Sequence, residues 1–160
     1  MLTIPRRSHP LGLGFKRKAD GMIPIPEDKS CHFSSEWENS SILLKVINQD
    51  RQACRLRPLS VSTWLSELAQ AHAHSMAERT KVRHTVQTIH ELKRYLRSHK
   101  VGENVQRGTS ILEMHDLSMS HYKVNRGNVL SRTYDEVGVG SSIGEDGHIY
   151  TCEFYRQAPQ

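Results

Sequence analysis

The side chains that could carry chemistry in this sequence are few and widely spaced. His84 ends the segment HSMAERTKVRH, and Glu103 follows within VGENVQRG. An imidazole and a carboxylate can share a hydrogen bond, exchange a proton or bind a divalent cation. A Ser/His/Glu hydrolase that used Ser120 as its nucleophile would need the same two residues, so this reaction stays open as an alternative.

Other signatures of catalysis are missing from the sequence. It contains no G-x-S-x-G, no P-loop and no C-x-x-C, and the His90–Glu91 pair lacks the second histidine of H-E-x-x-H because the next one is His99. His72 and His74 form an H-x-H pair, but two residues apart on a helix point about 200° away from each other. One metal ion could therefore not take both, and we expect His72 to pack inside and His74 to be exposed.

Helices and a hairpin must position these residues. Apolar residues at helical spacing predict a helix that begins near Ser40 or Ser41, a second from Ser60 or Ser62, a short one over IHELKRYLRSHK and another over 109–121. VGENVQRG predicts a turn and a short strand. The alternating segment TYDEVGVGSSIGEDGHIYTCEFYR, with GEDG as its turn, predicts a β-hairpin. These elements together predict an α+β fold.

The chain divides into three parts by composition. Residues 1–38 form a basic, proline-containing extension, 39–156 one domain and 157–160 a tail. The net charge of +5 is concentrated at the start, because residues 1–20 carry five Lys or Arg against Asp20 alone. The domain itself is nearly neutral, which makes nucleic acid an unlikely partner.

The sequence gives weak signals about compartment. No apolar run approaches the roughly 20 residues of a membrane-spanning helix, and no secretory signal segment is visible. For the chain as given, this favours an intracellular or non-classically exported protein, with the compartment left open. The three cysteines, Cys31, Cys54 and Cys152, cannot all pair within one chain, so we expect free thiols with Cys152 buried in a strand. A Cys31–Cys54 bridge remains an alternative.

Three segments, in this order and spacing, carry a resemblance to a known family: AQAHAHSMAERTKVRH, GENVQRG and NRGNVLSRTYDEVGVG. They resemble the core of the CAP superfamily (cysteine-rich secretory proteins, antigen 5 and pathogenesis-related 1 proteins), also called the SCP domain, and are closest to its compact bacterial-type branch. The resemblance runs roughly from Ile42 to Tyr155. It implies a three-layer α-β-α sandwich around a small, mostly antiparallel sheet.

The resemblance also implies a site. Many family members line a cleft with two histidines and two acidic residues that can hold a divalent cation. Carried over by position, the first histidine is His84 and the first acid is Glu103, but Asn125 stands where the second histidine belongs and the second acid has no counterpart. We therefore expect a degenerate metal site with His84, Glu103 and Asn125 as a hydrogen-bonded cleft. Binding of Zn²⁺ would need a displaced ligand, His121 or His115.

What the resemblance implies about function is a non-enzymatic domain. Such a domain would bind a small apolar or amphipathic ligand of the lipid or sterol class, or a protein partner, at the central cleft or between helices. Two alternatives remain. One is a metal-assisted hydrolase that uses His84 and Glu103 with a displaced ligand, and the other is a purely structural interaction domain.

Overall fold

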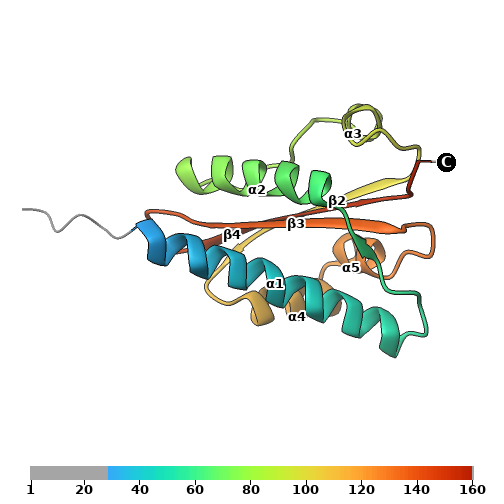
Figure 1. Ribbon diagram of the computed structural model, residues 1–160, viewed down its shortest axis with the longest axis horizontal. Helices are drawn as coiled ribbons and strands as arrows, with labels where there is room; N and C mark the ends of the chain where they lie inside the picture. The colour runs from blue at the N-terminus through green and yellow to red at the C-terminus, as the bar shows by residue number, and fades with distance from the viewer. Residues whose placement is uncertain (1–28, 160) are drawn as a thin grey trace, which may run out of the picture.

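The structure is a computed structural model that describes the backbone of residues 29–159 and the side chains of 35–159. Helices cover both faces of one four-stranded sheet (Figure 1). In chain order the elements are α1 (Lys29–Ala53), β1 (Ser60–Val61), α2 (Thr63–Glu78), α3 (Ile89–Tyr95), β2 (Val101–Gly108), α4 (Ile111–Ser120), α5 (Lys123–Val129), β3 (Glu136–Ile143) and β4 (Ile149–Arg156).

The sheet has the strand order β1-β3-β4-β2 and is mostly antiparallel, as expected. β3 and β4 form the predicted hairpin, and β4 also pairs along its whole length with β2. The two-residue strand β1 lies parallel to β3 and has no counterpart among the predictions. It is too short for an alternating pattern, and it exists because the Ser60 N–H donates to Asp135 O and the Ser62 N–H donates to Val137 O.

Helices α2 and α3 lie on one face of the sheet, the upper face in Figure 1, while α1, α4 and α5 lie on the lower face. The three-layer α-β-α sandwich is thus confirmed. Two helix starts follow from their capping residues. The Ser62 hydroxyl accepts from the Leu65 N–H, and Thr88 and Glu91 form a reciprocal capping box at α3.

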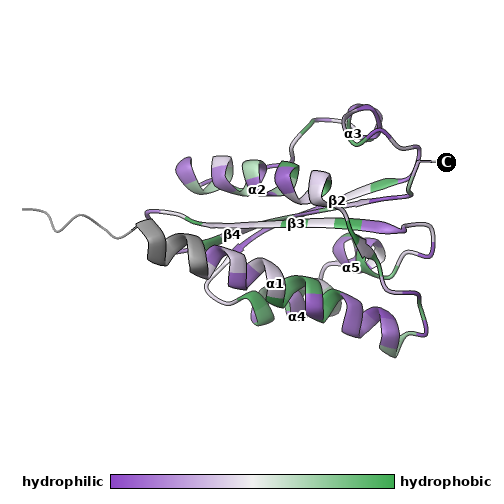
Figure 2. Cartoon of the chain, in the orientation of Figure 1, coloured by the Kyte–Doolittle hydropathy of each residue, from purple (hydrophilic) through white to green (hydrophobic). Residues whose placement is uncertain are grey.

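Each face of the sheet has its own apolar core, and β4 contributes to both because its side chains alternate. In Figure 2 the apolar colouring is strong on the middle of α1 and on α4, in the lower layer. The upper core includes Leu65, Ala69, Ala73, Met76, Leu92, Leu96, Tyr150, Cys152 and Phe154. The lower core includes Leu43, Ile47, Leu59, Ile111, Met114, Val129, Val137, Val139 and Tyr155.

The predicted start of the first helix is wrong, because α1 begins at Lys29 and runs through Ser40 and Ser41. Tertiary contacts hold this earlier part against the hairpin. The Glu36 carboxylate accepts from the Ser142 hydroxyl at 2.8 Å and from the Ile143 N–H at 3.0 Å. The predicted boundary at residue 38 therefore falls inside α1, and residues 1–28 of the predicted extension lie outside the described residues.

Two further sequence-based expectations concern cysteines and membranes. Cys54 is a free, exposed thiol and Cys152 is a free, buried one, as expected for the strand position of Cys152. The side chain of Cys31, the other half of the alternative bridge, lies outside the described side chains. Within residues 29–159, none of the helices combines the length and the apolar character needed to cross a bilayer.

Candidate functional site

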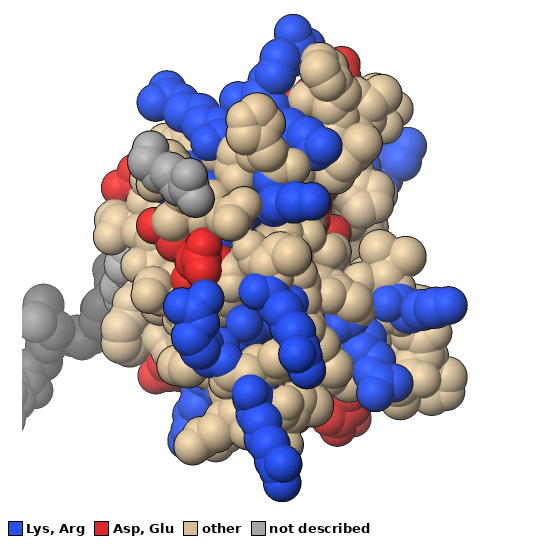
Figure 3. Space-filling view, turned by 90° about the vertical axis from the view of Figure 1, so that its right-hand side faces the viewer, with Lys and Arg blue, Asp and Glu red and all other residues tan. Residues whose placement is uncertain are grey.

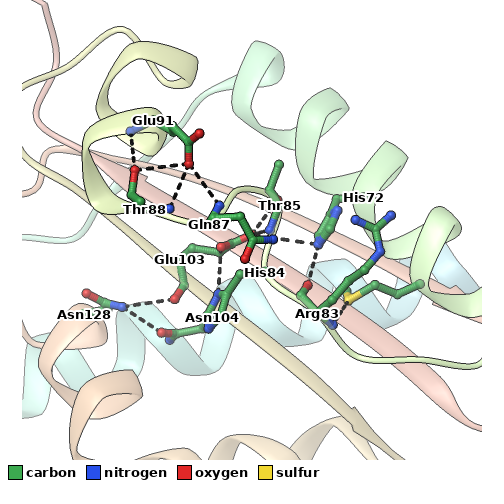
Figure 4. Close-up of polar contacts among 11 residues, drawn as sticks. His72, Arg83, His84, Thr85, Gln87, Thr88, Glu91, Glu103, Asn104 and Asn128 are labelled. Atoms are coloured by element: carbon green, nitrogen blue, oxygen red, sulfur yellow. Dashed lines mark hydrogen bonds and ion pairs between the residues drawn. The ribbon is translucent and has the colours of Figure 1, made fainter.

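The strand β2 places the carboxylate of Glu103 under α2 and the loop that follows it, where its side chain is only 4% exposed. Figure 4 shows this carboxylate directed at the loop. Its Oε1 accepts hydrogen bonds from the Thr85 N–H at 2.9 Å and from the Thr85 hydroxyl. Its Oε2 lies 2.8 Å from His84 Nδ1. Both oxygens of this buried carboxylate are thus engaged, as burial requires.

The predicted pairing of His84 with Glu103 is present in the structure. Since an ionised carboxylate can only accept, His84 Nδ1 is the donor in this hydrogen bond, and in the neutral form of the ring Nε2 is the nitrogen without a proton. The His84 side chain is 64% exposed, so it covers one side of Glu103 and reaches solvent on the other. This imidazole is available as a hydrogen-bond acceptor or as a single metal ligand.

A second histidine, His72 on α2, faces the same carboxylate. Its Nε2 lies 2.8 Å from Arg83 O and 3.9 Å from Glu103 Oε1. Burial lowers the pKa of His72, and the Arg83 carbonyl and the Glu103 charge only partly oppose this effect. A neutral His72 therefore donates to Arg83 O and holds the loop over Glu103. The prediction that His72 packs inside is correct, but its place beside Glu103 was missed.

A polar cluster on the other face of β2 locks α5 to the sheet. Asn104 donates to Glu153 Oε2 at 2.8 Å and to Asn125 O at 3.3 Å, and Asn128 Nδ2 donates to Asn104 Oδ1 at 2.8 Å. A Cβ on Gly102 would lie 2.4 Å from Asn128 Oδ1, so glycine is needed for this approach. The GEN and NRGN segments thus contact each other. Their occurrence together in the sequence reflects this packing of α5 against β2.

Asn125 does not join the pair. Its side chain donates to Ser118 Oγ at 3.1 Å and makes no hydrogen bond to His84 or Glu103. The predicted network of His84, Glu103 and Asn125 is therefore only half assembled by direct contacts. Asn125 is connected to β2 through its backbone carbonyl and Asn104 instead.

The two displaced-ligand candidates are engaged elsewhere. His121 is the exposed C-cap residue of α4, and its Nδ1 lies 2.6 Å from Ser120 Oγ. His115 is buried, with its Nε2 2.7 Å from Asp50 Oδ2, and so ties α4 to α1 on the lower face. Ser120 itself bonds to Asp116 O, which leaves no contact with His84 or Glu103 for a hydrolase triad.

Within the part of the chain that the structure describes, no group of three or more His, Cys, Asp or Glu side chains is arranged to hold a metal ion. The set His84, Glu103 and His121 is thus not brought together. Zn²⁺ sites in proteins use three or four protein ligands, and the two groups here fall short of that number.

Two hollows are candidates for the predicted small-molecule site. The central cleft beside His84 and Glu103 has a volume of about 260 Å³, and its other walls include Val86, Ile89 and Leu92. A larger groove of about 660 Å³ runs between α1 and α2 beside β3. We call it the α1–α2 groove, and it is lined by Glu36, Trp37, Ser40, Ser41, Leu44, Val61, Thr63, Ser66, Glu67, Gln70, Ala71, His74 and Val139.

Comparison with solved structures places this fold among SCP-type proteins. An outer surface protein of Borrelia burgdorferi aligns with a TM-score of 0.63 at 17% identity, over 76% of this chain and 94% of its own. An extracellular SCP-domain protein of Bacillus anthracis aligns with a TM-score of 0.65 at 19% identity, over 86% of this chain and 45% of its own. A cysteine-rich secretory protein of Staphylococcus aureus aligns with a TM-score of 0.61 at 18% identity, over 77% of this chain and 39% of its own.

The present chain therefore spans less than half the length of the latter two proteins. No curated protein sequence matches it. The family model for the cysteine-rich secretory protein family, CAP, matches residues 44–154, which include most of both core layers and the Glu103 site. By this match and by its three-layer fold, the chain belongs to the CAP family.

Proposed function

We propose that this CAP domain is a non-enzymatic binding module whose ligand is a small, uncharged amphipathic molecule of the sterol class, held in the α1–α2 groove. The observation that carries the proposal is the groove itself. Ligand sites in proteins are typically concave, mostly apolar and about 300–1,000 Å³ in volume, with a few polar groups that orient the ligand. The groove volume of about 660 Å³ lies within that range.

The groove walls supply apolar contact from both helices. Trp37 and Leu44 come from α1, Ala71 comes from α2, and Val61 and Val139 form the floor at the sheet. Trp37 is 69% exposed, an unusual position for the largest apolar side chain unless it covers something. A ligand between the helices would bury this indole.

The polar rim favours a neutral head group. Glu36 and Glu67 line the groove, and neither Lys nor Arg does. A fatty-acid carboxylate placed there would meet like charge, whereas a hydroxyl could donate to a carboxylate or accept from Ser41 or Ser66. Among lipids and sterols, these groups therefore favour molecules with a hydroxyl head.

The central cleft is a less suitable ligand site than the α1–α2 groove. Its volume of about 260 Å³ is below the range for drug-sized ligands, and a buried carboxylate forms its end. In this proposal the Glu103 cluster holds the α2–α3 loop in place and does not contact the ligand.

The test is binding of dehydroergosterol, followed by energy transfer from tryptophan to the sterol. We expect saturable binding that Ala71→Phe abolishes, because Ala71 is exposed in the groove wall and a phenyl ring would fill it. Ala53→Phe, an exposed alanine outside the groove, is the matched control and should bind like the parent. Equal binding by the two variants, or no saturable binding by the parent, would reject the sterol site and leave a protein partner as the occupant to test.

A further inference from the structure

A third hollow, separate from the central cleft and the α1–α2 groove, lies on the outer side of α3. It has a volume of about 440 Å³. Of the six residues that line it, three are Lys or Arg, two are His and one is Ser. We call it the basic hollow, and it is lined by His90, Lys93, Arg94, Arg97, Ser98 and His99. All of these except Ser98, which is half-buried, are exposed.

The positive charge of the domain is concentrated at this hollow. Residues 90–100 contain Lys93, Arg94, Arg97 and Lys100 against the single acid Glu91. Over the rest of residues 29–159 the Lys and Arg residues are balanced by an equal number of Asp and Glu residues. Figure 3 faces this end of the molecule, and Lys and Arg side chains stand out across it, including over α3 at the top.

These cations are not held in ion pairs. Within the described residues, Arg57, Arg107 and Arg156 each form an ion pair with a carboxylate, but none of the Lys or Arg side chains of the basic hollow does. The nearby acid, Glu91, uses its Oε2 to accept from the Gln87 and Thr88 N–H groups and the Thr88 hydroxyl. Like charges that line one hollow repel each other unless an anion lies between them.

One of the arginines is also held in place. The Arg97 guanidinium lies over the Trp64 ring, 5.5 Å from its centroid, and the Arg97 backbone takes a left-handed φ of 52°. Stacking on an indole restricts the planar guanidinium while leaving its N–H donors free. Lys93 and Arg94 line the same hollow, so a positioned arginine, a second arginine and a lysine can all bind one tetrahedral oxyanion there.

We propose that the basic hollow binds a phosphate ester that carries two or more negative charges. Arginine presents paired N–H donors to two oxygens of such a group, lysine adds a point charge, and Ser98, His90 and His99 offer further polar contacts. The size of the hollow suits one compact anionic group. The site shares no residue with the α1–α2 groove, so it does not depend on the proposed sterol site.

The experiment measures binding of two probes to the full chain. Inositol hexakisphosphate tests a soluble ester, and phosphatidylcholine vesicles containing phosphatidic acid test a lipid head group. Lys93→Gln/Arg94→Gln/Lys100→Gln removes three charges and leaves the stacked Arg97 in place. We expect this variant to bind at least about tenfold more weakly than the parent at low ionic strength.

The matched control is Lys45→Gln/Arg79→Gln/Lys81→Gln, which removes three charges at exposed positions outside the hollow. It should bind like the parent, and both variants should keep the parent's thermal midpoint. Loss confined to the first variant supports the site, and the probe that binds identifies a free ester or a head group as its source. Equal weakening by the control, or no binding of either probe to the parent, would overturn the proposal.

Discussion

At the scale of single residues, the described side chains around Glu103 form a hydrogen-bonded cluster that supports the loop after α2. Glu103 is buried, and Thr85 and His84 satisfy both of its oxygens, while His72 fixes the loop that carries them. A buried carboxylate that accepts this many hydrogen bonds stabilises the folded state only while its partners remain. The free energy of unfolding should therefore respond to Glu103 far more than to the exposed His84.

We predict that Glu103→Gln lowers the free energy of unfolding by about 1–3 kcal/mol, because hydrogen bonds to a charged acceptor are replaced by weaker neutral ones. Urea denaturation monitored by circular dichroism measures the change. His84→Ala is the comparison, and it should lower stability by no more than about 1 kcal/mol because its ring is mostly in solvent. If Glu103→Gln unfolds at the parent's urea midpoint, the supporting role assigned to this carboxylate is incorrect.

The sequence predicted part of this cluster. Pairing of His84 with Glu103 followed from the family resemblance, and the structure has it at 2.8 Å. Contacts of His72 and Asn125 could not be predicted, since they depend on the depth of α2 over β2 and on the rotation of α5. A histidine in the buried row of α2, beside Ala73 and Met76, was the available signal that a polar partner lay opposite.

At the scale of elements, the contact between α2 and β3 depends on glycine. A Cβ on Gly138 would lie 2.2 Å from the backbone carbon of Leu65, and no flexible side chain could move aside to admit it. The helix backbone therefore lies directly on the strand. The alternation V-G-V-G in β3 puts valines toward α1 and glycines toward α2. Every second residue of this part of the strand therefore lacks a side chain.

We predict that Gly138→Ala destabilises the protein by about 1–3 kcal/mol or more, as overpacking of a tight core does. Gly127→Ala is the matched control. Its Cβ would meet nothing within 4 Å, and Gly127 lies within α5. There alanine should add about 0.5–1 kcal/mol through helix propensity. Thermal unfolding of both variants measures these changes. A Gly138→Ala protein as stable as the parent would contradict the close approach of the α2 backbone to β3.

Most elements could be predicted from periodicity, and the exceptions have physical causes. The β3–β4 hairpin and the helix α2 follow from the alternating pattern and the Ser62 cap. The start of α1 could not be predicted, because Ser40 and Ser41 inside the helix resemble capping residues in the sequence. The hydrogen bonds that hold Glu36 to the hairpin are tertiary contacts, which local periodicity does not reveal. β1 has two residues and is defined only by its pairing with β3.

At the scale of the whole molecule, two cores on opposite faces are joined through one strand. β4 sends Tyr150, Cys152 and Phe154 into the upper core and Tyr155 into the lower one. It also lies between β3 and β2 in the sheet, so losing either helix layer exposes a face of β4. This connection argues that the two layers cannot unfold separately, although they share no helix.

We predict that weakening the upper layer destabilises the lower one equally. Leu65→Ala removes a fully buried side chain from the upper core and should lower the free energy of unfolding by about 2–5 kcal/mol. Native-state hydrogen exchange shows in which helices this loss of stability appears. The slowest amides of α1, around Leu43 and Ile47, should lose as much protection as those of α2, although α1 lies across the sheet. Ile47→Ala is the reciprocal variant and should reduce protection in α2. Protection that falls only in the substituted layer would mean that the sheet does not couple the two cores.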